Sequence, residues 1–312
     1  MCLIAFALNM RDDCPLLLAS NRDEFWERPT LPLAEWTLPG GVTVYSGRDM
    51  RAGGTWLGFS PSGRVAMLTN VRNGEPDGAP RSRGELVTRW LAGPLETPDW
   101  LALTGDHKAG DYGGFNLVLG DLRYADWLWL SNRPGHADSE GDPLPVDGGW
   151  HGLRLCPGVY GLSNAGLDTP WPKTCQLKTA TVQALDLLDH TTPGAPESWR
   201  HTLLDALLDR RLATDQELPR TGVPLERERQ LSSPFVHMPD AGYGTRSSLI
   251  ARWHAPAKGG QLELEEWTHA PGQAPGSDAG SADNANSSTH WPLTASTYRR
   301  VSMSTWGMPT SS

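Results

Sequence analysis

The chain opens with two short runs that are apolar at nearly every position, residues 3–8 and 16–19. A strand that is half exposed alternates apolar and polar side chains, whereas a strand that is apolar on both faces must be covered on both faces. Residues 9–15, between the two runs, are rich in turn formers. The pattern therefore predicts an antiparallel hairpin that lies inside a layered fold.

The register of this hairpin brings two chemically different groups together. If Leu8 pairs with Leu16, Cys2 lies opposite Arg22, and Asp23 follows directly. Directly opposed side chains in an antiparallel pair have their Cβ atoms roughly 5 Å apart. The pairing therefore predicts a thiol, a guanidinium and a carboxylate in one small volume.

Alternation and turn chemistry predict further strands along the chain. They are expected at residues 42–45, 53–59 with 64–68, 115–119 with 127–130, 159–164, 234–237, 245–253 and 262–267. The glycines of 53–58 lack the Gly-Lys-Ser/Thr ending of a phosphate loop, so we interpret them as sites of close backbone approach. Prolines interrupt residues 25–39, which we expect to follow the surface. The charged segment 218–230 is likewise expected to be a surface connection.

Apolar residues at helical spacing predict three clear helices. The first follows a capping box at residues 82–85 and ends at Gly93-Pro94, and a short second one is expected near Thr97. Two longer helices are expected over 175–188 and 198–212. Strands at both ends of the chain and helices in the middle predict an α+β fold, a four-layer α-β-β-α sandwich of two antiparallel sheets. A barrel and an ordinary β-sandwich are the competing architectures.

Length and composition indicate a folded domain followed by a tail. The 312 residues can bury a sizeable core. From about residue 268 the composition shifts to Gly, Ala, Ser, Asn and Pro, which bury too little apolar surface to offset the entropy of ordering. We therefore predict a domain over 1–267 and a largely mobile tail over 268–312, apart from docking of Trp291, Tyr298 or Trp306.

Charge and motif content exclude several classes of function. The net charge of −9 has no basic stripe, which argues against a nucleic-acid partner. No apolar run reaches about 18 residues, so no membrane span is expected. The four cysteines have neither CxxC spacing nor a paired histidine, so we expect free thiols, no metal and no cofactor. The N-terminus lacks the basic region of a secretory signal, which predicts a cytoplasmic protein.

Position 2 gives Cys2 a chemistry that an internal cysteine lacks. Initiator methionine is usually removed before a residue as small as cysteine, which would leave a free α-amine on Cys2. An α-amine has a pKa of roughly 7.7 and a thiol of roughly 8.5, so the amine can accept the thiol proton near neutral pH. Arg22 would stabilise the thiolate and Asp23 would orient the amine. The alternative is that Cys2 is a small buried apolar residue.

Several motifs resemble one known family. They are Asn21-Arg22-Asp23-Glu24, Arg28-Pro29-Thr30, Thr55-Trp56-Leu57-Gly58, Leu68-Thr69-Asn70-Val71-Arg72, Ser82-Arg83-Gly84, Phe115-Asn116-Leu117, Gly161-Leu162-Ser163-Asn164, Asp168-Thr169-Pro170-Trp171-Pro172-Lys173 and Tyr243-Gly244-Thr245-Arg246-Ser247-Ser248. In this order, with the N-terminal Met-Cys, they resemble the NRDE-motif family, whose animal members are called transport and Golgi organisation proteins. The N-terminal pattern is more remotely similar to cysteine N-terminal-nucleophile (Ntn) hydrolases.

The remoter resemblance implies an Ntn-hydrolase-like fold and a set of roles. Cys2 would be the nucleophile, with Arg22 and Asp23 as its polar partners. Asn70 and Asn164 would donate to the oxyanion, and Arg246 would complete the site. Those acylases carry their acid a few positions after the arginine, whereas Asp23 follows Arg22 directly. Without the resemblance, each Asn could simply close a turn and Arg246 could be a structural ion-pair partner.

Two functions follow from these residues. The first is an N-terminal-cysteine amidohydrolase, or amidase, acting on a small linear amide or acyl substrate. The second is a non-catalytic protein on the same scaffold that handles haem or lipid, or that serves trafficking and secretion, as the resemblance to the animal proteins implies. No haem-attachment motif occurs in the chain.

Overall fold

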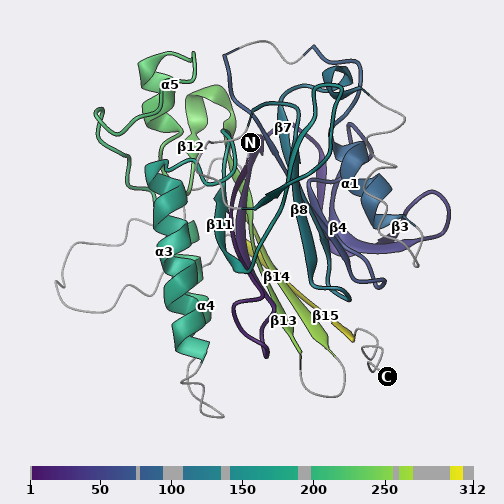
Figure 1. Cartoon of the computed structure of the whole chain (residues 1–312). Helices are drawn as coiled ribbons and strands as arrows, with labels where there is room; N and C mark the ends of the chain where they lie inside the picture. Colours follow the sequence, from purple (N-terminus) through teal and green to yellow (C-terminus); the bar gives the residue numbers. More distant parts are fainter. Residues whose placement is uncertain are drawn as a thin grey trace, which may run out of the picture.

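The computed structural model describes residues 2–74, 78–93, 108–134, 141–188, 198–255, 260–269 and 296–304. Within them the chain forms two antiparallel sheets with few helices (Figure 1). The elements are β1 (Cys2–Leu8), β2 (Leu16–Phe25), β3 (Thr30–Thr37), β4 (Thr43–Asp49), β5 (Leu57–Phe59), β6 (Arg64–Asn70), α1 (Gly84–Leu91), the 3-10 helix η1 (Ala109–Asp111), β7 (Phe115–Asp121), β8 (Asp126–Ser131), β9 (Asp142–Pro143), β10 (His151–Arg154), β11 (Gly158–Leu162), α3 (Pro172–Leu187), α4 (Ser198–Leu207), α5 (Leu225–Gln230), β12 (His237–Met238), the 3-10 helix η3 (Pro239–Ala241), β13 (Tyr243–His254), β14 (Gln261–His269) and β15 (Ser296–Ser304).

The strand order separates the two sheets clearly. The first sheet runs β11-β1-β2-β13-β14-β15, with β12 added beside β13. The second sheet runs β3-β4-β5-β6-β7-β8-β10-β9. Each order has two ends, so the fold is a sandwich of two open sheets and not a closed barrel.

Strand β1 shows how the first sheet is covered on both sides. Its side chains Cys2, Ile4, Phe6 and Leu8 belong to the core between the sheets, and the alternate residues belong to the core under α3 and α4. A third core lies under α1, which packs on β5 and β6 of the second sheet. Figure 1 shows α3 and α4 on one outer face and α1 on the other. The predicted α+β, four-layer α-β-β-α sandwich is therefore confirmed.

The predicted hairpin register is also confirmed. Leu8 pairs with Leu16, and Cys2 pairs with Arg22. The neighbouring pair, β2 with β13, contains a register shift between Thr245 and Ser247, so that Arg246 is an extra residue in a β-bulge. Bulges redirect side chains and are common beside functional sites.

Two segments expected to be surface connections contain regular structure. Residues 30–37 form β3 because an edge strand tolerates proline, and Pro32 falls within the register shift between Leu31 and Ala34. The second segment, 218–230, contains α5, in which Glu228 is buried and lies 2.7 Å from the guanidinium of Arg72. The sequence of a charged segment does not show which of its charged residues will be buried beside an opposite charge.

The helices differ from the predictions in three places, and the first is α3, which spans Pro172–Leu187 and not 175–188. Helix α1 begins at Gly84, but no side chain caps it, so the predicted capping box is wrong. The Glu85 carboxylate instead accepts hydrogen bonds from Arg81 (2.6 Å) and Tyr112 (2.5 Å). Helix α4 ends at Leu207, before residue 212. The short helix expected near Thr97 lies outside the described residues.

A strand forms within the segment that was expected to be a mobile tail. Strand β15 pairs with β14 along its length, and Tyr298 packs against Trp267 with 5.5 Å between ring centroids. Met303 is buried in the core between the sheets. Trp291 and Trp306 lie outside the described residues, and the domain boundary at 267 stays a prediction.

Candidate active site

Cys2 lies at the end of β1, where a cleft of about 570 Å³ reaches it. Figure 1 places the amino terminus at one end of the sheets. The cleft is lined by Cys2, Arg22, Asp23, Glu24, Phe25, Arg28, Asp49, Arg51, Ala52, Gly54, Thr55, Trp56, Leu68, Asn70, Ala79, Pro80, Arg81, Ser82, Arg83 and Gly84. Cys2 is only 5% exposed, so its thiol lies at the bottom of this cleft rather than on an open surface.

The close approach of two backbone segments shapes one wall of the cleft. A Cβ atom on Gly54 would lie 3.0 Å from the backbone of Gly84. This confirms that the glycine-rich segment 53–58 serves close backbone approach at this position.

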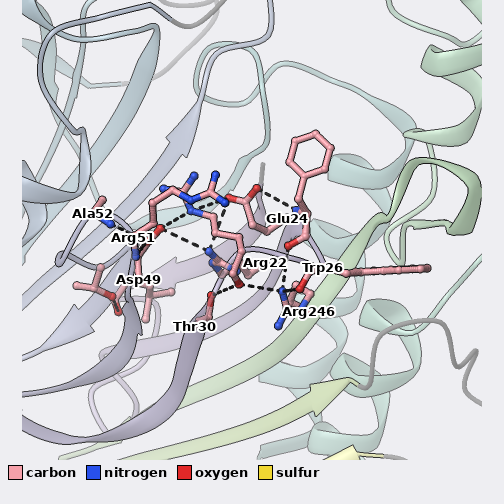
Figure 2. A network of polar contacts seen from close by, with 12 residues as sticks. Arg22, Glu24, Trp26, Thr30, Asp49, Arg51, Ala52 and Arg246 are labelled. Carbon is pink, nitrogen blue, oxygen red and sulfur yellow. Dashed lines mark hydrogen bonds and ion pairs between the residues drawn. The ribbon is translucent and has the colours of Figure 1, made fainter.

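Arg22 is held beside Cys2 by aromatic and acidic groups. Its guanidinium carbon lies 4.1 Å from the centre of the Trp56 ring. Its Nη2 lies 3.7 Å from a Glu24 oxygen and 3.8 Å from an Asp49 oxygen. Figure 2 shows both carboxylates converging with Arg22. The cation is therefore fixed next to the thiol by a ring and two opposite charges.

Asp23 also lines the cleft, but its carboxylate lies toward Lys173 of α3, on the face of β2 that packs against the helices. Its Oδ1 accepts a 2.7 Å hydrogen bond from the Thr245 hydroxyl, which in turn accepts one of 2.9 Å from the backbone N–H of Val236. Burial raises the pKa of Asp23, while the positive charges of Lys173 and of the amino terminus lower it.

Lys173 is the functional candidate that sequence reasoning missed. It lies in the first turn of α3, is 2% exposed, and its Nζ donates a 2.9 Å hydrogen bond to the carbonyl oxygen of Leu231. Burial lowers the pKa of Lys173 to about 8, although the charge of Asp23 opposes the shift. Lys173 continues the buried helical stripe of Leu177, Ala180 and Ala184. If the helix had been predicted to start at residue 172, Lys173 would have fallen on its apolar face, and a lysine on an apolar face would have indicated a functional candidate.

The protonation state of the thiol follows from its surroundings. Burial raises the pKa of Cys2, and the positive amino terminus and Arg22 oppose that shift. A thiol with a raised pKa is protonated at neutral pH, so a reaction needs a base. Tyr243 is also buried nearby, and its hydroxyl has no hydrogen-bond partner within the described part of the chain.

The remaining predicted site residues take different positions. Asn70 lines the cleft at the end of β6. Asn164 is fully buried, and its amide donates a 2.9 Å hydrogen bond to the Asn70 carbonyl oxygen. Arg246 donates to the carbonyl oxygens of Phe25 (3.0 Å) and Trp26 (3.0 Å), so it holds the segment after β2 (Figure 2). Of the six predicted residues, four line the cleft, and Asn164 and Arg246 support its wall.

Two structural features bear on cofactors and membranes. In the described ranges, no group of three His, Cys, Asp or Glu side chains could hold a metal ion. None of the helices described here combines the length and the apolar content needed to cross a membrane.

A comparison with solved structures finds a distant neighbour. The N-acylethanolamine-hydrolyzing acid amidase orthologue of Caenorhabditis elegans is 11% identical and has a TM-score of 0.35, over 80% of this chain and 91% of that one. Because this TM-score is low, we assign the fold from the sheets and helices described above and not from this neighbour.

Sequence comparisons give a clearer relationship. The human Transport and Golgi organization protein 2 homolog is 33% identical over 266 residues, which cover 80% of this chain and 87% of the human one. The Mus musculus homologue is 31% identical over 268 residues, with the same coverage. The model of the family described as Transport and Golgi organisation 2 matches residues 1–267. With all the motifs above lying inside that match, the chain belongs to the Transport and Golgi organisation 2 family.

Proposed function

We propose that this protein is an amidohydrolase that uses Cys2 as an N-terminal nucleophile on a small amide. The observation that carries the proposal is the position of Cys2, which lies at the bottom of an open cleft directly opposite Arg22. Buried structural cysteines have no such access and no adjacent cation.

The reaction has two steps, acylation of Cys2 and hydrolysis of the thioester, and the thiol and the α-amine of Cys2 take part in both. Removal of Met1 frees the α-amine of Cys2, which takes the thiol proton as Sγ attacks the carbonyl carbon. The C–N bond then breaks, and the α-ammonium gives its proton to the leaving nitrogen. Water next attacks the thioester, losing a proton to the amine, and releases the acid with regeneration of the thiol.

Neighbouring residues stabilise the charges that develop. Asn70 lines the cleft, and its side-chain amide would donate to the oxyanion. Arg22 favours the thiolate. Asp23 and Lys173 form a buried pair of opposite charge on the far side of β2, where Asp23 would orient the α-ammonium group. Asn164 contributes by holding the backbone of Asn70.

The names of the relatives suggest a second function, in transport and Golgi organisation. A cleft of about 570 Å³ can hold a small ligand without reacting with it. Eight charged residues line it, Arg22, Asp23, Glu24, Arg28, Asp49, Arg51, Arg81 and Arg83. Such a lining favours a polar ligand over a lipid chain, and haem would need its propionates to face these arginines.

Mass spectrometry of the intact protein tests the proposal. We expect the purified chain to lack Met1 and to gain one acyl group from an activated ester, mapped to the N-terminal peptide. Cys156 and Cys175 are exposed free thiols, so the measurement uses a C156S/C175S background. In that background Cys2→Ala should abolish labelling and leave the circular dichroism spectrum unchanged. Retention of Met1, or equal labelling of the Cys2→Ala protein, would contradict the mechanism.

A further inference from the structure

A second cavity of about 560 Å³ adjoins the cleft of Cys2. The two share Asn70, Ala79 and Arg83 as lining residues. The second cavity is lined by Asn70, Val71, Arg72, Asn73, Gly74, Gly78, Ala79, Arg83, Gly110, Gly113, Gly114, Arg133, Val223, Arg227 and Leu231. Both volumes lie in the range of small-molecule sites, roughly 300–1,000 Å³.

The lining of the second cavity is unusually cationic for this protein. Four arginines contribute to it (Arg72, Arg83, Arg133 and Arg227), and none of its described lining residues is acidic. The whole chain carries a net charge of −9, so the positive charge of this cavity is opposite in sign to that of the protein as a whole. The cleft of Cys2 differs, because three acidic residues there (Asp23, Glu24 and Asp49) offset part of the charge of its five arginines.

Ion pairs within the described residues neutralise only part of this charge. Arg72 pairs with Glu228 at 2.7 Å, yet its side chain is 7% exposed and its Nη1 has no hydrogen-bond partner there. Arg133 donates to the backbone oxygen of Asn132 (3.0 Å) and makes no ion pair within the described ranges, and neither does Arg227. Burial lowers the pKa of Arg72, and the acidic groups Glu228, Tyr243 and Asp23 oppose that shift. The charge of Arg227 has a smaller lowering effect, so the two cations are close enough to repel each other.

From these contacts we infer that the second cavity is an oxyanion subsite. It would bind a phosphate group, or a carboxylate with its smaller negative charge, on the part of the ligand remote from the carbonyl that Cys2 attacks. Guanidinium groups suit such oxyanions because their N–H donors match two oxygens at once. A bound oxyanion would also relieve the repulsion between Arg72 and Arg227. The substrate class is then a small acyl compound with a phosphate-bearing end, an assignment that rests on the proposed function.

Gly110 provides a test that leaves the four arginines in place. It lies in η1, lines the second cavity, is exposed, and a Cβ there would meet no atom within 4 Å. Gly110→Asp therefore adds a negative charge at the cavity, and Gly110→Asn adds nearly the same shape without the charge. The pair separates electrostatics from steric effects.

Titration calorimetry with inorganic pyrophosphate measures the subsite alone. We expect saturable binding that weakens about tenfold or more in Gly110→Asp and in Arg133→Met/Arg227→Met, but little in Gly110→Asn. A parallel titration with succinate distinguishes phosphate from carboxylate. Tighter pyrophosphate binding supports the phosphate class, and tighter succinate binding overturns that class. Absent binding of both anions, or equal pyrophosphate affinities of the Asp and Asn variants, would overturn the subsite itself.

A second measurement connects the subsite to Cys2. Two activated esters that differ only in a terminal phosphate or hydroxyl on the acyl chain are compared by the rate at which they acylate Cys2. We expect the phosphate ester to react about tenfold faster, and Gly110→Asp to remove that advantage. If neither ester labels Cys2 while pyrophosphate still binds, the proposed nucleophile fails and the anion site stands. Equal rates with both esters would refute a shared substrate.

Discussion

At the scale of single residues, the site is defined by ionisable groups that burial forces into unusual states. Asp23 and Lys173 are almost completely buried on one face of β2, and Cys2 and Arg22 lie on the other face. Burial disfavours charge on Asp23, Lys173 and Cys2, and the opposite charge of its partner partly compensates for Asp23 and for Lys173. Substitution of Asp23 should therefore change the pKa of Lys173, and substitution of Lys173 should change the pKa of Asp23.

Lys173 should make stability depend on pH. Its pKa is about 8 in the folded chain and about 10.5 when unfolded, so between these values only the unfolded state holds the proton. The free energy of unfolding should then rise by about 3 kcal/mol from pH 8 to 10.5 through this group alone. Urea unfolding of wild type and Lys173→Met across this range measures the difference, with Lys108→Met as the exposed control. Parallel curves for all three proteins would refute the depressed pKa.

Thr245 should be the residue that fixes the Asp23 carboxylate. The Thr245 hydroxyl bridges Asp23 and the backbone of Val236, and Thr245→Val removes both hydrogen bonds while keeping the shape. We expect a loss of about 1–3 kcal/mol in unfolding free energy, and an altered pH profile of Cys2 acylation. Thr37→Val, at an exposed threonine of β3, provides the control. An unchanged pH profile in Thr245→Val would limit Thr245 to a structural role.

At the scale of elements, α3 connects the helical layer to the strands that carry the site. It packs on β1, β2 and β11 through its buried stripe, and the first turn of the same helix places Lys173. Spacing of apolar residues made this helix predictable, except for its first three residues. Strand β3 was not predictable in that way, because Pro32 suggests a loop unless the strand is known to lie at an edge.

Helix α3 should tolerate change on its outer face but not on its inner face. Leu177 is fully buried against the first sheet, so Leu177→Ala should cost about 2–5 kcal/mol of unfolding free energy. Val182 is 45% exposed on the same helix, and Val182→Ala should change stability by less than about 0.5 kcal/mol. Chemical denaturation of both variants compares them directly. Similar effects would mean that α3 is not docked as described.

At the scale of the whole molecule, β15 completes the first sheet. Without it, β14 would present a row of unpaired backbone groups at the sheet edge, and such edges promote aggregation. Composition alone could not predict this strand, because its partner β14 is what supplies the hydrogen bonds and the apolar contact of Tyr298 with Trp267.

Truncation should show whether β15 belongs to the folded domain. A chain ending at His269 should have a lower Tm and form oligomers in size-exclusion chromatography, since it loses β15 and the buried Met303. A chain ending at Ser304 keeps the strand and should behave as the full-length protein. Equal Tm values for the two truncations would instead support a domain that is complete near residue 267.

The sequence by itself determined the local structure and the chemistry that this protein can offer. Doubly apolar runs required a layered fold, and the hairpin register placed Cys2 opposite Arg22, because these depend only on periodicity and neighbouring residues. Tertiary structure alone decided which distant groups meet there. Lys173, Thr245 and Trp56 reach Cys2, Arg22 and Asp23 from α3, β13 and the second sheet, and the arginines of the second cavity come together from separate segments. Such contacts are set by the packing of layers, and no short-range pattern in the chain encodes them.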